Sequence, residues 1–481
     1  MKEIQPNVWM FEKEGSMCVP AIAIASEQLL SLMQKDNTLT QLKNVATLPN
    51  IVKHSIVMPD GHQGYGFPIG GVAAFPYDDG IISPGGIGFD INCGVRLIKT
   101  SLKRDEVTPK LPRLLDSLFK NVPSGLGSKA RVKFSKSEIK ELLSEGAPYV
   151  IKKGYGWEED LNFMESNGSL PGDPSYVSDR AISRGAPQAG SLGAGNHFLE
   201  VQHVEKVYSD VAKSFGLEEG QVVVMIHTGS RGLGHQVCSD YLRDMERQNP
   251  DIVKSLPDRE LIYAKLHTDL ADHYMKAMYA AANFAFANRQ MITHWVRQSF
   301  ESVFGSSAES LGMSILYDVA HNIAKTEYHD VDGVKKRLIV HRKGATRSFP
   351  AGHDDIPNVY RSVGQPVLIP GSMGTASYVL VGSSKAMSLT FGSTAHGSGR
   401  VLSRHAVIKS RSKGTSVNSA GIRLKNELEN KGILVRSASM RTLLEESPEA
   451  YKDIDEVVRV SHEVGIGNLV ARLRPMGVVK G

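Results

Sequence analysis

The chain has 481 residues, of which 41% are hydrophobic, and its formal net charge is +5 with an isoelectric point near 8.8. This composition excludes a disordered or fibrous chain, and the absence of a signal segment or a membrane-sized apolar run predicts a cytoplasmic protein with no membrane partner. The mild basic excess fits a nucleic acid or nucleotide partner without requiring one.

Short β-branched runs predict five buried strands, at residues 54–59, 94–100, 221–227, 336–342 and 365–371. Apolar residues at three- and four-residue spacing predict helices at residues 136–154, 257–302, 418–432 and 446–462. The alanine-rich stretch 257–302 is long enough for one or two helices, and the helix at 446–462 is expected to end the chain. We therefore expect a mixed α+β fold.

Glycine-rich clusters lie between these apolar segments, where the backbone needs unusual angles or close approach to a ligand. They are "GHQGYGFPIGG" (61–71), "SPGGIGFD" (83–90), "AGSLGAGNHF" (189–198), "HTGSRGLGH" (227–235), "IPGSMG" (369–374) and "HGSGR" (396–400). No composition break, linker or repeat divides the chain. We expect a single domain over 1–481, in which these distant clusters converge on one site.

The sequence offers a set of candidate metal ligands. Three cysteines, an odd number spread along the chain, do not suggest a disulfide framework, and only Cys93 has a nearby carboxylate, Asp90, in a glycine-rich setting. Imidazole, thiolate and carboxylate together suit Zn²⁺, Mn²⁺, Fe²⁺ or Co²⁺. The histidines in glycine clusters or after apolar runs are His62, His197, His227, His321 and His396. If Asp90, Cys93, His197, His227 and His321 converge, they can hold two metals with a bridging thiolate; for each histidine the alternative is a structural role.

The usual nucleotide-binding motifs are absent. There is no G-x-x-x-x-G-K-[ST] loop, no G-x-G-x-x-G in a strand-to-helix unit and no K-x-D-G lysine. A neutral histidine can instead attack an α-phosphorus and form a phosphoramidate. "HGSGR" supplies His396, two glycines that let phosphate approach, and Arg400.

Taken together, these strings resemble the RtcB-type RNA ligases, the GTP- and manganese-dependent 3′-phosphate ligases also called tRNA-splicing ligases. The resemblance runs from "MPDGHQGYGFPIGGV" (58–72) through "GGIGFDINCGVR" (85–96) to the terminal "RPMGVVKG" (474–481). One departure is visible: Ser398 stands where the family usually has alanine, and it adds a hydroxyl close to the expected guanylate phosphate.

The resemblance implies roles for individual residues. Cys93 is expected to bridge two Mn²⁺ ions, with Asp90 and His197 on one ion and His227 and His321 on the other. Asp60 is a second-sphere acid, and His396 is the nucleophile that takes GMP. The implied GTP-binding residues are Asn196, His197, Phe198, Leu199, Glu200, His321, Asn322, Pro370, Gly371, Ser372, Met373, Ser377, His396, Gly397, Ser398, Gly399 and Lys480.

The implied activity joins RNA 2′,3′-cyclic-phosphate or 3′-phosphate ends to 5′-hydroxyl ends, through histidine–GMP and RNA-(3′)pp(5′)G intermediates. Its RNA partners would be tRNA halves or broken RNA, and its activator archease. Candidate RNA-phosphate contacts are Arg184, Arg231, Lys343, Arg347 and Arg400. Two other classes remain: a two-metal phosphoesterase or nuclease, which needs no GTP, and an inactive RNA-binding subunit, which has no use for five metal ligands.

Overall fold

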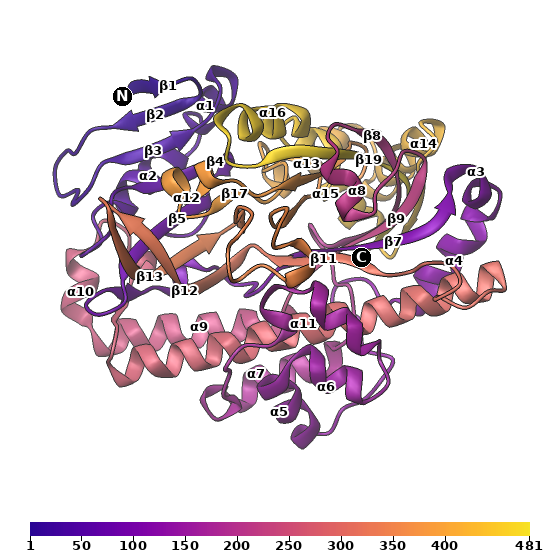
Figure 1. Cartoon of the computed structure of the whole chain (residues 1–481), viewed down its shortest axis with the longest axis horizontal. Helices are drawn as coiled ribbons and strands as arrows, with labels where there is room; N and C mark the ends of the chain where they lie inside the picture. Colours follow the sequence, from indigo (N-terminus) through magenta and orange to yellow (C-terminus); the bar gives the residue numbers. More distant parts are fainter.

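Two largely antiparallel sheets form the middle of the molecule, and a long helix runs beneath them (Figure 1). The computed structural model describes all residues from 1 to 481. The fold is mixed α/β, as the sequence predicts.

The first sheet contains seven strands near the N-terminus and in the middle of the chain. In sheet order they are β1 (Lys2–Gln5), β2 (Val8–Phe11), β3 (Ala21–Ile24), β4 (Ser55–His62), β5 (Ile69–Pro76), β13 (Val334–Lys343) and β12 (Asn322–Val331). The predicted strands at 54–59 and 336–342 are confirmed as parts of β4 and β13.

The second sheet contains eight strands and carries the residues of interest. Seven of them follow the order β11 (Ile315–Ala320), β7 (Gly94–Lys103), β9 (Gln221–Thr228), β8 (Phe198–Val207), β19 (Asn468–Lys480), β16 (Ser377–Val381) and β15 (Pro366–Ile369), and β18 (Leu434–Ser437) pairs in parallel with β19. The predicted strands at 94–100, 221–227 and 365–371 are confirmed as β7, β9 and β15. Alternate residues of β9 enter different hydrophobic clusters, because successive side chains point to opposite faces.

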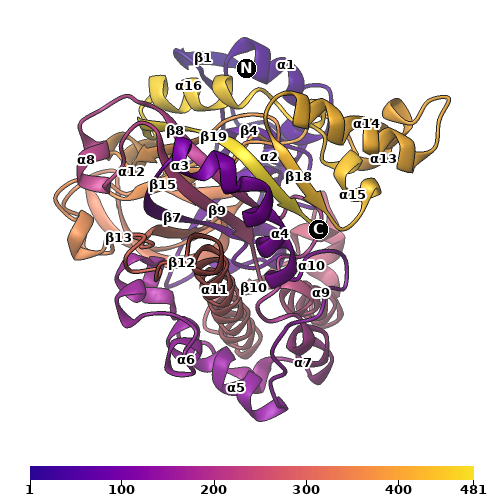
Figure 2. The same ribbon diagram turned by 90° about the vertical axis from the view of Figure 1, so that its right-hand side faces the viewer.

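The long helix is α11 (Asp269–Phe304), which packs under the second sheet and is seen almost end-on in Figure 2. It begins twelve residues later than the predicted 257–302, so that boundary was wrong. The preceding residues form a 3₁₀ turn and the short strand β10 (Ala264–Lys265), which pairs with β6 (Ile81–Ile82). Thr268 then caps the helix, since its side chain accepts a hydrogen bond from the Ala271 N–H.

Two other helix predictions need correction. The stretch 136–154 forms two helices, α5 (Lys136–Glu145) and α6 (Ala147–Lys152), because Gly146 between them has a positive φ of 74°. The helix predicted at 446–462 is α16 (Ile454–Val464), and the chain ends in strand β19 instead. The prediction at 418–432 is confirmed as α14 (Val417–Asn430).

The other helices surround the two sheets and the long helix α11 (Figure 2). They are α1 (Glu27–Met33), α2 (Thr38–Val45), α3 (Arg104–Val107), α4 (Leu111–Asn121), α7 (Asp179–Gly185), α8 (Val211–Phe215), α9 (Arg231–Gln248), α10 (Pro250–Ser255), α12 (Ser384–Thr390), α13 (Arg404–Arg411) and α15 (Met440–Glu445). Of these, α13 and α15 project outward. Helix α9 was missed because its first turn lies in the glycine-rich string 227–235. None of the helices has the length and apolar content that crossing a bilayer requires.

Candidate metal centre and nucleotide site

Four neighbouring strands bring the predicted metal ligands to one edge of the second sheet. Cys93 precedes β7, His197 precedes β8, His227 lies near the end of β9, and His321 follows β11. Because neighbouring strands run antiparallel, the start of one lies beside the end of the next. Ligands that are far apart in the sequence therefore meet at one place.

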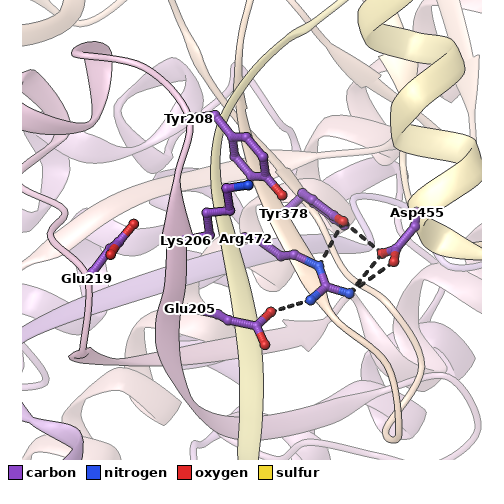
Figure 3. Close-up of a pocket in the computed structure, with 7 residues that line it drawn as sticks. All are labelled: Glu205, Lys206, Tyr208, Glu219, Tyr378, Asp455 and Arg472. Atoms are coloured by element: carbon purple, nitrogen blue, oxygen red, sulfur yellow. Dashed lines mark hydrogen bonds and ion pairs between the residues drawn. The ribbon is translucent and has the colours of Figure 1, made fainter.

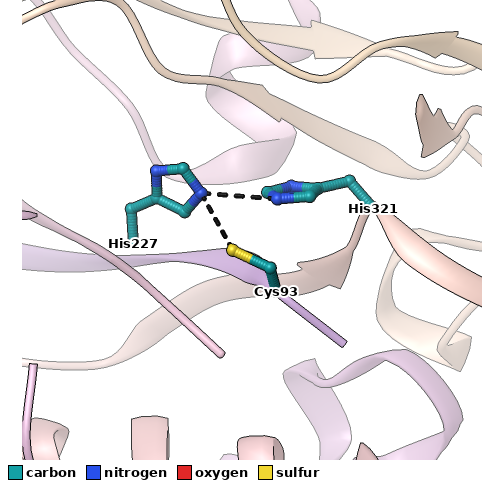
Figure 4. A group of neighbouring side chains, drawn as sticks. All are labelled: Cys93, His227 and His321. Carbon is teal, nitrogen blue, oxygen red and sulfur yellow. Dashed lines mark hydrogen bonds between the residues drawn. The ribbon is translucent and has the colours of Figure 1, made fainter. Parts of the chain in front are cut away.

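The side chains of Cys93, His227 and His321 face one another (Figure 4), and His197 and Asp90 lie next to them. Cys93 Sγ lies 3.4 Å from His227 Nε2 and 3.5 Å from His197 Nε2. His227 Nε2 lies 3.4 Å from His321 Nε2, and His197 Nε2 lies 2.7 Å from Asp90 Oδ2. Two three-residue groups result, one with His227 and His321 and one with Asp90 and His197, and Cys93 belongs to both.

The protonation chemistry of the cluster fits metal binding. Burial, followed by the nearby charges of other histidines, lowers the pKa of His227 and of His321 well below its usual range, so both are neutral imidazoles, the form that binds metals. Burial and the Asp90 carboxylate raise the pKa of the Cys93 thiol. The thiolate therefore needs a cation beside it. His197 Nδ1 lies 3.1 Å from the Leu192 carbonyl oxygen, and this second hydrogen bond turns Nε2 toward the cluster.

A buried arginine on α11 holds the backbone beside three of these ligands. Arg289 Nη1 donates to the carbonyl of Asn92, next to Cys93, at 2.8 Å, and to the carbonyl of Thr228, next to His227, at 3.0 Å. Its Nε and Nη2 donate to the two carboxylate oxygens of Asp318 on β11, the strand that leads to His321. One side chain thus connects β7, β9 and β11 at the cluster. Sequence reasoning missed it, because an arginine within an alanine-rich helix gives no ligand-like signal.

The neighbouring Asn288 fixes the loop that leads to His197. Its Oδ1 accepts hydrogen bonds from the N–H groups of Gly190 and Ser191, and its Nδ2 donates to the carbonyls of Ser191 and Gly229. The middle of α11 therefore acts as a scaffold for the whole cluster.

The predicted nucleophile His396 lies directly beside this cluster. Its ring centroid is 4.8 Å from that of His321, and its Nδ1 is 2.5 Å from Asp60 Oδ2. The same carboxylate oxygen accepts the backbone N–H of His396 at 3.0 Å and of Gly397 at 3.2 Å. Although burial opposes it, the charge of His396 holds the pKa of Asp60 below its usual value. Gly399 is required here, because a Cβ at this position would lie 2.0 Å from the Asp60 carbonyl oxygen.

Several predicted GTP-binding residues leave buried polar atoms without partners. Glu200 is 1% exposed and its Oε1 has no hydrogen-bond donor, although Gln202 Nε2 donates to its Oε2 at 2.7 Å. Gln202 also donates to Ser377 Oγ at 3.1 Å. Ser398 Oγ is buried without a partner. Burial raises the pKa of Glu200 and lowers that of Lys480, each to about 8. Unpaired buried polar atoms of this kind are typical of a site that receives a polar ligand.

The remaining predicted GTP-binding residues are distributed unevenly. Pro370 lies against the nucleophile loop, since a Cβ at Gly397 would be 3.3 Å from its carbonyl oxygen. Asn196 is exposed, whereas the side chain of Leu199 packs into the largest hydrophobic cluster. Asn322 is occupied by backbone groups, accepting from Gly344 N–H and donating to the Asp90 carbonyl. Gln202 was missed by sequence reasoning, although its position two residues after Glu200 puts it on the same face of β8.

Two of the predicted RNA contacts prove to be interior residues. Lys343 is 6% exposed and its Nζ donates to the carbonyls of Tyr65 and Phe67, and Arg347 is 3% exposed and lies beside Glu165. Both are bonded within the fold, so predicting them as phosphate contacts was wrong.

The other three predicted RNA contacts, and His62, lie nearer the surface. Arg184 is exposed, Arg231 is half-buried beside Ser191, and Arg400 pairs with the buried Glu446. His62 lies outside the metal cluster, with its Nδ1 3.0 Å from the Asp60 carbonyl oxygen.

A hollow of about 680 Å³ on the outer side of β8 and β19 is separate from this site (Figure 3). The one arginine that lines the hollow, Arg472, is already paired with Glu205 and Asp455, and it donates a hydrogen bond to the hydroxyl of Tyr378. Glu205 lies eight residues along β8 from His197, a distance of roughly 25 Å in an extended strand. This hollow therefore does not belong to the metal centre.

Comparison with known proteins agrees with this geometry. The family described as tRNA-splicing ligase RtcB matches residues 41–481. The chain is 60% identical to a tRNA-splicing ligase RtcB of Thermococcus kodakarensis, over 100% of this chain and 99% of the relative. It is 55% identical to the one of Methanococcus maripaludis, over 97% and 95%, and 54% identical to the one of Aeropyrum pernix, over 100% and 99%.

Proposed function

Because the chain belongs to the RtcB family, we propose that it is an RNA ligase of tRNA splicing and RNA repair. It joins a 3′-phosphate or 2′,3′-cyclic-phosphate RNA end to a 5′-hydroxyl end and consumes GTP. The observation that carries this proposal is the position of His396, which lies between the Asp60 carboxylate and the ring of His321.

The proposed cofactor is a pair of Mn²⁺ ions. Asp90 and His197 would hold one ion, His227 and His321 the other, and Cys93 would bridge them; the shared thiol and the facing Nε2 atoms support this division. A soft thiolate favours Mn²⁺ or Zn²⁺ over Mg²⁺. When bound, the two cations supply positive charge to the phosphate oxygens of the reacting nucleotide.

The first proposed step forms a histidine–GMP adduct. The Asp60 carboxylate next to Nδ1 keeps the proton on that nitrogen, so the lone pair of His396 lies on Nε2. Nε2 attacks the α-phosphorus of GTP, a P–N bond forms, and pyrophosphate leaves.

Two further transfers would complete ligation. An oxygen of the RNA 3′-phosphate attacks the phosphorus of the adduct, which frees His396 and gives RNA-(3′)pp(5′)G. The 5′-hydroxyl of the second RNA then attacks the RNA-side phosphorus, GMP leaves, and a phosphodiester remains. A 2′,3′-cyclic end is first opened by water to a 3′-phosphate.

The proposed guanylate site uses the unpaired atoms around β8. The unpaired Oε1 of Glu200 offers an acceptor for the N1–H or the 2-amino group of guanine, and Lys480 offers a positive charge close to it. Ser377 and the loops 370–373 and 396–399 line the remaining sides.

The manganese and GTP assignments, archease dependence, cytoplasmic location and single-domain boundary stay predictions.

A ligation assay tests the proposed function. RNA carrying a labelled 3′-terminal phosphate is incubated with a 5′-hydroxyl RNA, Mn²⁺ and GTP. We expect the label to enter a longer product and to resist phosphatase, only when GTP is present. Release of the label as inorganic phosphate without GTP would instead support the phosphoesterase alternative.

A further inference from the structure

Acidic residues are missing from a long part of the chain around the nucleophile loop. No Asp or Glu occurs from residue 356 to residue 426, although the sequence contains 51 of them, and none occurs from 117 to 137. Both stretches contain several lysines and arginines. The modest net charge of the whole chain therefore hides two stretches of sequence whose only charged side chains are basic.

The first of these stretches includes α13, which begins just after the nucleophile loop. With α14 and α15 it projects from the body of the molecule (Figure 2). Arg400 and Arg404 near its start are paired with the buried Glu446. Arg411 on the same helix is paired with Glu427 and Glu449. Lys409 and Lys413 are exposed and form no ion pair, so the charges of these two lysines are not neutralised within the protein.

The second stretch runs along the other side of the loop that leads to His197. Gly125 N–H donates to the Gly193 carbonyl at 2.9 Å, and Arg404 approaches the same loop from α13, with its Nη2 3.1 Å from the Cβ position of Gly195. Lys129 and Lys133 in this stretch are exposed and unpaired. The two stretches that carry these unpaired lysines therefore both contact the loop 193–195 beside the site, one through Gly125 and the other through Arg404.

We propose that Lys129, Lys133, Lys409 and Lys413 form a basic rim that binds the phosphate backbone of RNA beyond the joined ends. Binding would be independent of sequence, because lysines contact phosphates without reading bases. This inference rests on the proposed function for the identity of the polyanion. The rim would hold the nucleotides that flank the junction and raise the affinity for RNA without taking part in the reaction with GTP.

The salt dependence of RNA binding tests the rim quantitatively. Each phosphate contact on a single strand contributes about 0.7 to the slope of log K against log salt concentration. With a fluorescent single-stranded RNA ending in a 3′-phosphate, we expect Lys409→Gln/Lys413→Gln and Lys129→Gln/Lys133→Gln each to reduce the slope by about 1.4, and the four-lysine variant by about 2.8.

The matched control is Lys335→Gln/Lys336→Gln, which removes two exposed charges at the β12–β13 turn. It should leave the slope unchanged. An unchanged slope in the four-lysine variant, or an equal reduction of the slope in the control, would overturn the proposed rim. If only one lysine pair reduces the slope, the other stretch does not belong to the rim. A separate measurement, labelling of the wild-type enzyme by GTP without RNA, distinguishes the two proposals. An absence of labelling contradicts the proposed function, whereas the salt dependence of RNA binding still tests the rim.

Discussion

Arg289 and Asp318 form a bidentate ion pair, with Nε–Oδ2 and Nη2–Oδ1 distances of 2.8 Å. Both side chains are fully buried. The remaining nitrogen, Nη1, holds the carbonyls of Asn92 and Thr228 beside two candidate metal ligands. A single guanidinium therefore connects the core of the fold to the candidate metal centre.

We predict that Arg289→Lys weakens metal binding by about 10- to 100-fold, because lysine keeps the charge but cannot reach both carbonyls and the carboxylate. Isothermal titration calorimetry with Mn²⁺ measures this effect. The control is Arg297→Lys on the same helix, which breaks a comparable buried pair with Asp160 away from the ligands. Both variants should lose stability, by up to about 3–5 kcal/mol. Equal metal affinity in the two variants would reduce Arg289 to a purely structural role.

The raised pKa of Cys93 predicts that metal binding strengthens as pH rises. The thiol must lose its proton to bind a cation, so below its pKa each bridging event releases one proton. Calorimetry in buffers of different ionisation enthalpy counts that proton. In Cys93→Ala the number of protons released should fall by one, and each chain should bind fewer than two metal ions. A variant that keeps two ions would show that the thiolate is not shared.

Asp60→Asn should slow formation of the GMP adduct by about 10²- to 10⁴-fold while leaving GTP affinity nearly unchanged. The amide still accepts the backbone N–H groups of His396 and Gly397, but it no longer offsets charge at Nδ1 or fixes the tautomer. Rapid-quench measurement of adduct formation, together with equilibrium GTP binding, separates the two quantities. A loss confined to binding would contradict the orienting role of Asp60.

Glu200 predicts a pH-dependent stability of known sign. Its pKa in the folded state is about 8, above the ordinary value of 4.5, so the folded state binds more protons and becomes less stable as pH rises between these values. The full effect is about 1.4 kcal/mol per pH unit for one group. Chemical denaturation at pH 5, 6 and 7 should show a smaller decline in Glu200→Gln than in the wild type. In Glu205→Gln the decline over this range should match that of the wild type. Although burial opposes it, Arg474 and Arg472 lower the pKa of Glu205 below 4.5, so its carboxylate is ionised in both the folded and the unfolded state above that pH.

The sequence predicted which side chains converge better than it predicted the framework that holds them. Glycine clusters next to β-branched runs place Cys93, His197, His227 and His321 at strand ends. Antiparallel pairing of these strands then brings the four side chains to one edge of the sheet. The roles of Arg289, Asn288 and Gln202 could not be predicted, because they depend on which distant backbone groups a side chain reaches in the folded chain. The predicted RNA contacts at Lys343 and Arg347 were wrong for the same reason, because a position near a glycine cluster in the sequence does not tell whether a side chain is buried.

The most direct test of the account is the fate of GTP labelled at its α-phosphate. The protein is incubated with this nucleotide and Mn²⁺, denatured, and digested to locate the label by mass spectrometry. We predict an acid-labile, alkali-stable GMP adduct on His396 that is absent from His396→Ala and strongly reduced in Cys93→Ala. Label on another residue, or equal labelling of His396→Ala, would contradict the assignment of His396 as the nucleophile.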